Sequence, residues 1–292
     1  MFSMDSFEFG KDVNLKDFCT FHIGGNAKFL FIAKSTKTLL EACQFATDNN
    51  IKFKVIGLGA NLLFDNEGYN GLIIVNQTNK ILFRKGIVYV ESGVNVTNLI
   101  MKCYMRSLSG LENLAGIPAT VGGAVVNSLG AFDTNFSDFV EYVECYNIND
   151  LTKKKKLTNK DCKFGYRTSL FKSGNYIITK VKLKLSDDNK PLIQQRIKEA
   201  IEKKKSTQPL NYPSAGSVFK RTKIIPAKVI DELNLKGRKI GGAEISTKHA
   251  GFIVNTNSAT SEDVKELITL IQEKVKTTHN ENLEPEIEFV EY

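Results

Sequence analysis

The chain has 292 residues, of which 42% are hydrophobic and 25% are charged. This balance excludes global disorder and predicts a sizeable core spread over two or three lobes. The formal net charge of +8 can serve nucleic acid, an acidic membrane or small polyanions. No stretch approaches the roughly 18 apolar residues of a membrane span, and Met1 to Gly10 lacks an export signal. We therefore expect a cytoplasmic protein without membrane insertion.

The five cysteines are widely spaced, odd in number and without a CxxC pair. Such a set fits neither a disulfide framework nor a zinc site. We expect reduced structural thiols and no metal.

Hydrophobic periodicity predicts the following elements in chain order. Alternation with a period of two predicts strands at 52–56, 87–91, 140–148 and 176–185, the last with Lys180, Lys182 and Lys184 on one face and Val181, Leu183 and Leu185 on the other. Helical spacing predicts helices at 38–48, 97–108 and 192–205, and one after Thr260 with Val264, Leu267, Ile268, Ile271 and Val275 as its apolar stripe. Thr260 and Asp263 form a predicted capping box for that last helix. Strands mixed with helices, without an internal repeat, predict an α+β protein.

The main basic cluster, Lys153 to Lys156, follows Asn149-Asp150 and is predicted to be a solvated hairpin tip. No aromatic residue interleaves with these lysines, as a single-strand-binding surface would need. We therefore expect no nucleic acid partner. Prolines at 209 and 213 end regular structure and mark the predicted main domain boundary.

Three glycine-rich loops precede residue 125. They are Thr20-Phe21-His22-Ile23-Gly24-Gly25, the run from Gly57 through Gly59, Ala60, Asn61 and Leu62 to Leu63, and the run from Gly110 through Gly116, Ile117, Pro118, Gly122 and Gly123 to Ala124. The second loop follows a predicted strand, where backbone N–H groups converge on a pyrophosphate. It lacks GxGxxG spacing, so a simple tight turn is the alternative. Together the three loops indicate one large bound cofactor.

These loops closely resemble those of the UDP-N-acetylenolpyruvoylglucosamine reductase family. The resemblance continues through Gly165 to Phe171, Ala215 to Lys220, Lys248 to Asn255 and Leu283 to Glu286. It implies an α+β fold with a two-subdomain FAD-binding region of the vanillyl-alcohol-oxidase type and a C-terminal α+β substrate-binding domain. The expected segments are 1–75 joined by the tail 284–292, then 76–205, then 206–283. The short spacing between Arg167 and Ser217 resembles the family's shorter class, without a substrate-clamping tyrosine loop.

The resemblance also implies an activity. NADPH reduces bound FAD, which then reduces the enolpyruvyl group of a UDP-N-acetylglucosamine derivative to give UDP-N-acetylmuramate, a peptidoglycan precursor. The expected FAD-binding residues are Gly57, Gly59, Ala60, Asn61, Leu62, Gly116, Ile117, Pro118, Gly122 and Gly123. The expected partner is the small UDP-sugar, and we expect a monomer.

Hydride addition to an enol ether conjugated with a carboxylate builds negative charge on that carboxylate, so the site needs a cation or a proton donor there. Arg167 and Glu286 match the family positions for this role, and Ser217 matches the proton donor. Lys220 is a candidate to assist Ser217. Substrate contacts are expected from Tyr166, Lys205, Lys220 and Arg221.

Each residue also has a non-catalytic interpretation. Arg167 would be a surface ion pair, Ser217 a turn residue and Glu286 a solvent-facing strand position. His249 is predicted to be a hydrogen-bonded structural residue rather than a catalyst. The alternative functions are an FAD-dependent sugar or alcohol oxidase of the same fold and a non-enzymatic UDP-sugar sensor.

Overall fold

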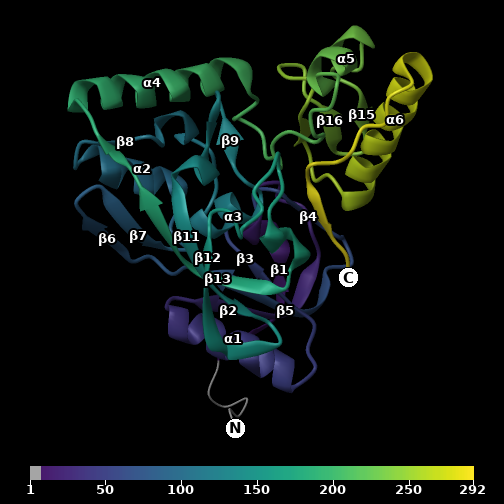
Figure 1. Cartoon of the computed structure of the whole chain (residues 1–292). Helices are drawn as coiled ribbons and strands as arrows, with labels where there is room; N and C mark the ends of the chain where they lie inside the picture. Colours follow the sequence, from purple (N-terminus) through teal and green to yellow (C-terminus); the bar gives the residue numbers. More distant parts are fainter. Residues whose placement is uncertain (1–7) are drawn as a thin grey trace. The chain divides into compact units, whose positions relative to one another are not determined.

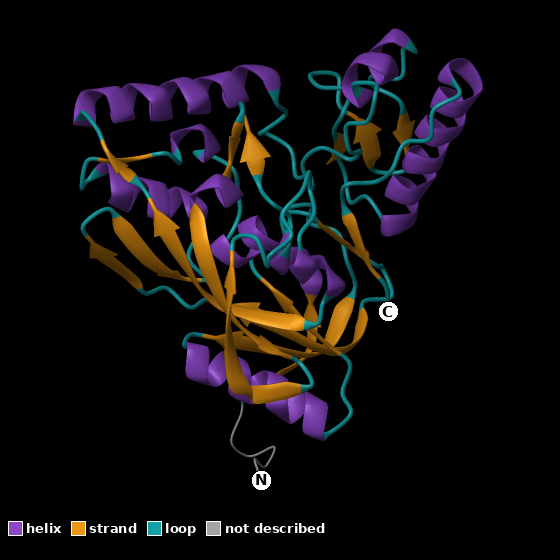
Figure 2. Cartoon of the chain, in the orientation of Figure 1, coloured by secondary structure: helices purple, strands orange, loops and turns teal. Residues whose placement is uncertain are grey.

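The computed structural model describes residues 8–292, and the first seven residues, part of the stretch expected to lack an export signal, lie outside this range. The chain forms two compact units (Figure 1). Unit 1 is built mainly from Leu30–Gly57 and Leu72–Lys203, and unit 2 from Gly10–Phe29, Leu58–Gly71 and Lys204–Tyr292. Both combine helices with strands (Figure 2), which confirms the α+β class.

A five-stranded antiparallel sheet in the order β12-β11-β13-β7-β6 forms the centre of unit 1. Its strands are β6 (Ile81–Arg84), β7 (Ile87–Glu91), β11 (Val140–Asn147), β12 (Asp150–Thr158) and β13 (Tyr176–Lys184). Val181 and Leu183 are buried, whereas Lys182 on the opposite face is only partly so. This confirms the predicted alternation, because successive side chains of a strand point to opposite faces.

Three helices of unit 1 supply apolar side chains to the same core. They are α2 (Val96–Tyr104), α3 (Val121–Val126) and α4 (Lys190–Thr207). Leu99, Val125 and Ile193, one from each helix, are buried in one cluster with Val90 and Val181 of the sheet. The short strand pairs β8 (Leu108–Ser109) with β14 (Ser186–Asp187) and β9 (Gly130–Ala131) with β10 (Thr134–Asn135) also belong to unit 1.

A second sheet has the order β1-β2-β5-β3. Its strands are β1 (Gly10–Asn14), β2 (Asn26–Ala33), β3 (Phe53–Ile56) and β5 (Tyr69–Asn76), and the unit boundaries fall within β2 and β5. Helix α1 (Thr36–Asp48) begins at a capping box formed by Ser35 and Thr38. Strand β3 runs parallel to β5 and ends at Ile56, directly before the second glycine loop.

Unit 2 contains the three-stranded sheet β15 (Lys239–Ile240), β16 (Ala243–Ile245) and β17 (Ile253–Asn255), with helices α5 (Pro226–Glu232) and α6 (Ser261–His279). Thr260 and Asp263 form the predicted capping box of α6, and its predicted apolar stripe is buried. In the same unit β18 (Glu288–Val290) pairs in parallel with β4 (Leu62–Phe64). The C-terminal tail therefore lies beside the second glycine loop. The three-segment division expected from sequence stays a prediction.

Two sequence-based expectations are corrected. Lys153 to Lys156 lie within β12 rather than at a hairpin tip, which falls between Asn147 and Asp150. Pairing with β11 accounts for this, because Lys154, Lys155 and Lys156 lie opposite Tyr146, Cys145 and Glu144 in the antiparallel register. Lys154 also forms an ion pair with Glu144 at 3.5 Å. The helix predicted at 97–108 ends at Tyr104, since Ser107 adopts a left-handed φ of 57° before β8.

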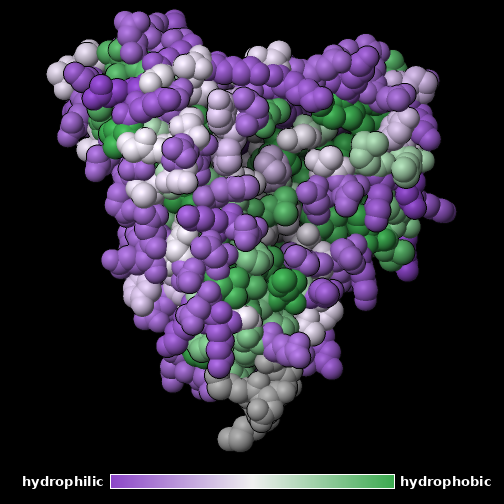
Figure 3. Space-filling model, turned by 180° about the vertical axis from the view of Figure 1, so that it is seen from behind, coloured by the Kyte–Doolittle hydropathy of each residue, from purple (hydrophilic) through white to green (hydrophobic). Residues whose placement is uncertain are grey.

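All five cysteines are buried and free, in agreement with structural thiols. Burial raises the pKa of the Cys43 and Cys103 thiols to about 12, so both stay protonated and unreactive at neutral pH. Within residues 8–292, no helix has the length and apolar character needed to cross a bilayer. The face of the molecule drawn in Figure 3 is mostly hydrophilic, with smaller areas of apolar side chains.

Candidate active site

Gly57 and Thr120 bring two of the predicted cofactor loops together within unit 1. A Cβ at Gly57 would lie 2.3 Å from Thr120 Oγ1, a distance that no real side chain tolerates. Thr120 caps α3, because its Oγ1 accepts a hydrogen bond of 3.2 Å from the Gly123 amide. Glycine at position 57 is therefore required for the close approach of these two loops.

The third glycine loop is fastened to the end of β7 by its own backbone. The Gly122 amide donates to the Ser92 carbonyl at 2.7 Å, and the Val121 amide donates to the Val94 carbonyl at 2.8 Å. The amides of Gly122 and Gly123 both donate to partners within the protein and so hold the loop in place. The role of these residues in binding FAD stays a prediction.

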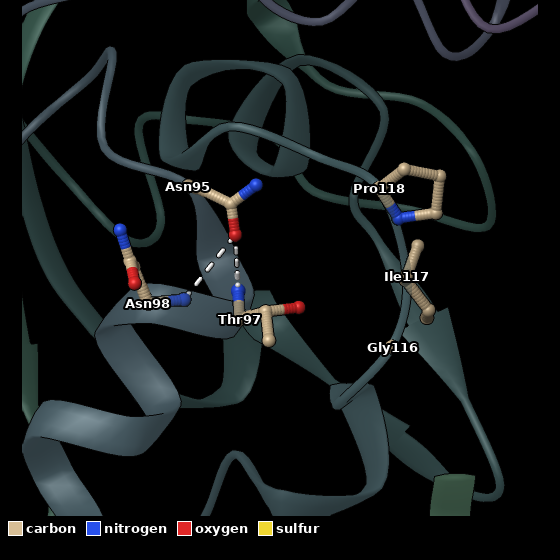
Figure 4. A pocket seen from close by; sticks show the side chains of 6 residues that line it. All are labelled: Asn95, Thr97, Asn98, Gly116, Ile117 and Pro118. Carbon is tan, nitrogen blue, oxygen red and sulfur yellow. Dashed lines mark hydrogen bonds between the residues drawn. The ribbon is translucent and has the colours of Figure 1, made fainter.

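A hollow of about 430 Å³ lies between this loop and the start of α2 (Figure 4). Its lining residues are Gly116, Ile117 and Pro118, which the sequence predicted, together with Asn95, Thr97 and Asn98, which it missed. Asn95 caps α2, since its Oδ1 accepts from the amides of Thr97 at 2.8 Å and Asn98 at 3.2 Å. The hollow thus lies at the positive end of a helix, where anions are stabilised. An asparagine directly before an amphipathic helix was the available sequence signal.

Arg167 occupies a strained position in unit 1. Its φ is 54°, in the left-handed region that residues other than glycine rarely adopt. Its Nη2 donates to the Gly130 carbonyl at 2.9 Å, and its guanidinium lies 5.2 Å from the ring of Tyr166, which is 53% exposed. Such strain persists where the surroundings hold it in place, and it is concentrated at functional sites. The contacts of the Arg167 side chain therefore stabilise a backbone conformation that arginine disfavours by itself.

Ser217 and Glu286 lie on neighbouring backbone segments within unit 2. Ser217 forms an antiparallel bridge with Phe252, and Phe219 forms one with Pro285. The Glu286 amide donates to the Val218 carbonyl at 2.7 Å. Ser217 is exposed and Glu286 is half-buried. Two residues that are 69 positions apart in the sequence are thus brought together.

The second glycine loop forms hydrogen bonds with the segment of unit 2 that carries Glu286. Asn61 Nδ2 donates to the Glu286 carbonyl at 3.0 Å, and the Glu288 amide donates to the Asn61 carbonyl at 2.8 Å. Glycine at position 59 allows the loop to pass close to the backbone of Phe18. Its φ is 61°, and a Cβ there would lie 2.3 Å from the Phe18 carbonyl oxygen. Asn61 and Leu62 therefore lie beside the segment that carries Glu286.

The three basic residues among the predicted substrate contacts have different surroundings. Lys220 Nζ is paired with the Glu284 carboxylate, and the Lys220 amide donates to the Glu284 carbonyl at 2.9 Å. Lys205 and Arg221 are exposed, and the Lys205 carbonyl accepts from Lys248 Nζ at 2.5 Å. Substrate contact by Lys220 would therefore compete with an existing ion pair.

His249 has the surroundings of a structural residue. Its Nδ1 accepts a hydrogen bond of 3.1 Å from the Gly251 amide, and its ring packs edge-on against Phe252 at 4.9 Å. Burial lowers the pKa of His249, so the neutral ring is favoured. The Gly251 carbonyl accepts from the Val218 amide at 2.9 Å, which connects the segment of His249 to the segment that follows Ser217.

Comparison with known proteins identifies relatives across the whole chain. Residues 208–290 match the family model described as UDP-N-acetylenolpyruvoylglucosamine reductase, C-terminal domain, and residues 27–150 match an FAD binding domain. The reductase of that name from Caldicellulosiruptor bescii is 40% identical over 97% of this chain and 91% of its own length. The one from Thermotoga maritima is 38% identical over 91% and 93%. The crystal structure of the reductase from Thermus caldophilus superposes with a TM-score of 0.83 at 34% identity, covering 97% of this chain and 99% of that one.

Proposed function

The chain belongs to the UDP-N-acetylenolpyruvoylglucosamine reductase family, and we propose on that premise that it is an FAD-dependent oxidoreductase. It reduces UDP-N-acetylglucosamine enolpyruvate to UDP-N-acetylmuramate for peptidoglycan synthesis, with NADPH as the reductant. The observation that carries the proposal is the backbone hydrogen bond between the segment of Glu286 and the segment of Ser217, the candidate proton donor.

The hollow between the third glycine loop and the start of α2 supports FAD binding, because the positive end of a helix there favours the phosphate groups of the cofactor. Gly59, Ala60, Asn61 and Leu62 would hold the cofactor from one loop, and Gly116, Ile117, Pro118, Gly122 and Gly123 from the other. FAD held by these residues would supply the redox chemistry, the transfer of a hydride from NADPH to the methylene carbon of the substrate.

The protein's own residues supply the remaining chemistry. The Arg167 fork binds the substrate carboxylate in a bidentate manner and stabilises the charge that develops there. The Ser217 hydroxyl gives its proton to the carbon that carries the carboxylate. Glu286 stabilises the same developing charge as a neutral carboxyl group or by orienting another donor.

The excess of positive charge on the chain favours the binding of anionic substrates. The UDP-sugar and NADPH both carry phosphates, and a net charge of +8 raises their local concentration. Lys205 and Arg221 are exposed and are the proposed phosphate contacts, with Tyr166 and Lys220 as further substrate contacts. A cytoplasmic monomer is part of the same proposal.

One anaerobic experiment tests donor, cofactor and acceptor together. The purified protein is reconstituted with FAD, and the flavin absorbance is followed as NADPH and then UDP-N-acetylglucosamine enolpyruvate are added. The proposal requires bleaching by NADPH and recovery on addition of the sugar nucleotide. Recovery only with oxygen, with consumption of simple sugars or alcohols in the absence of NADPH, would instead identify an oxidase. Binding of the UDP-sugar without flavin would identify a sensor.

A further inference from the structure

We propose that Asn61 is a positioning residue for Glu286, in addition to any contact that it makes with FAD. This inference rests on the proposed function, because it assigns Asn61 to the half-reaction in which the enolpyruvyl group is reduced. It concerns residues of unit 2 only, all of them within the described part of the chain.

The two hydrogen bonds of Asn61 lie on either side of Ile287. The side-chain amide donates to the carbonyl of Glu286, and the main-chain carbonyl accepts from the amide of Glu288, at 3.0 and 2.8 Å. The Glu286 amide itself donates to the Val218 carbonyl at 2.7 Å. The peptide groups before and after the Glu286 Cα are thus both held, one by the segment after Ser217 and the other by Asn61.

The carboxamide is not what sets the strand pairing of this region. Leu62, Leu63 and Phe64 pair in register with Glu288, Phe289 and Val290, and this ladder uses backbone groups alone. The Asn61 carboxamide adds one bond, and that bond reaches the carbonyl directly after the Glu286 Cα. Removal of the carboxamide should therefore leave the ladder intact while freeing the Glu286 peptide group to rotate.

Glu286 is half-buried, and in the proposed mechanism its carboxyl group stabilises charge at one substrate carboxylate. Catalytic groups of this kind act only from a defined position, and a displacement of about 1 Å can slow a reaction about 100-fold. The loss should appear when the substrate is reduced. It should not appear when NADPH reduces the flavin, because Glu286 has no role in that step.

The experiment compares Asn61→Ala with wild type in both half-reactions, with Asn282→Ala as a control at an exposed asparagine near the same segment. We expect the variant, saturated with FAD, to be reoxidised by the enolpyruvyl substrate about 100-fold more slowly than wild type, and bleaching by NADPH to slow much less. In a Glu286→Gln background the same substitution should slow reoxidation less than about threefold, because coupled residues are not additive. Asn282→Ala should change neither half-reaction.

Asn61→Asp provides a second variant of nearly the same shape. Its ionised carboxylate cannot donate to the Glu286 carbonyl, whereas the protonated form can. Reoxidation by this variant should therefore recover relative to wild type as the pH falls through the pKa of the new carboxyl group. A loss that does not depend on this hydrogen bond, such as an altered contact with FAD, would give no such recovery.

Three outcomes would overturn the inference while the proposed function stands. They are slower bleaching with normal reoxidation in the FAD-saturated variant, equal slowing in the wild-type and Glu286→Gln backgrounds, and no pH-dependent recovery in Asn61→Asp. If wild-type flavin is bleached by NADPH but not reoxidised by the sugar nucleotide, the proposed function itself fails, and the inference falls with it.

Discussion

The main-chain amide of Glu286 donates a hydrogen bond of 2.7 Å to the carbonyl of Val218, the residue that follows Ser217. This bond joins the two segments that carry the candidate proton donor and a candidate stabiliser of the developing negative charge. Because it is a backbone bond, side-chain substitutions at Ser217 or Glu286 can change the chemistry without removing it.

Ser217→Ala should separate the two half-reactions. Bleaching of the flavin by NADPH should stay within about twofold, whereas reoxidation by the enolpyruvyl substrate should slow by about 10²–10⁴-fold, the usual contribution of a positioned proton donor. Stopped-flow absorbance measures both rates. Ser214→Ala is the matched control, since Ser214 is tied to Thr20 through its backbone amide and carbonyl. Equal losses in both half-reactions would contradict the role given to Ser217.

Arg167→Lys should impair substrate reduction even though the charge is retained. A lysine cannot offer the planar fork that binds a carboxylate with two hydrogen bonds, so reoxidation should slow about 10²–10³-fold while bleaching by NADPH changes little. Arg106→Lys serves as the control, because the Arg106 guanidinium lies over the ring of Phe83 at 4.0 Å and has no proposed catalytic role. Normal reoxidation in Arg167→Lys would remove Arg167 from the mechanism.

Gly57→Ala should destabilise the protein and weaken FAD binding. The new Cβ would meet Thr120 Oγ1 at 2.3 Å, and overpacking of this kind costs about 1–3 kcal/mol. Gly123→Ala is the matched control, because its Cβ would have Thr120 Oγ1 as nearest neighbour at an ordinary 3.5 Å. Differential scanning fluorimetry of the FAD-free proteins should show a lower Tm only for Gly57→Ala. An unchanged Tm would mean that the two loops separate at little cost.

His249 should make the protein less stable in mild acid. Burial lowers the pKa of folded His249 below its ordinary value of 6.5, so the unfolded chain binds the proton more readily. Stability should therefore fall as the pH drops from about 6.5 towards the folded-state pKa, and should level off below it. The protonated ring can no longer accept the hydrogen bond from the Gly251 amide. Thermal unfolding of wild type and His249→Gln is measured at a series of pH values. The Tm of wild type minus that of His249→Gln should decrease as the pH falls through this interval, and a constant difference would contradict the prediction.

Local patterns were sufficient for several elements of the fold. The alternation at 87–91 predicts β7 with its exact bounds, and the apolar stripe with Thr260 and Asp263 predicts α6 and its capping box. These elements depend on neighbours within a few residues, so their signal survives in the sequence. The glycine motifs likewise pointed to the family, because a long ordered set of motifs is specific.

Contacts between distant segments account for what local patterns missed. The lysines at 153–156 resemble a solvated tip by composition, yet they belong to β12, which pairs with β11. Asn95 joins the hollow beside Pro118 only because the third glycine loop packs against the start of α2. The left-handed backbone of Arg167 also has no sequence signal, since the residue type disfavours it.

Residue types, periodicities and ordered motifs thus specify the class of fold, the family and the candidate catalytic groups. The bond from Asn61 to Glu286, which spans 225 positions, arises only in the folded chain. A hydrogen bond forms when donor and acceptor come within about 3 Å in a suitable direction. That condition depends on how the folded chain places the Asn61 side chain and the Glu286 carbonyl, and no local sequence pattern predicts it.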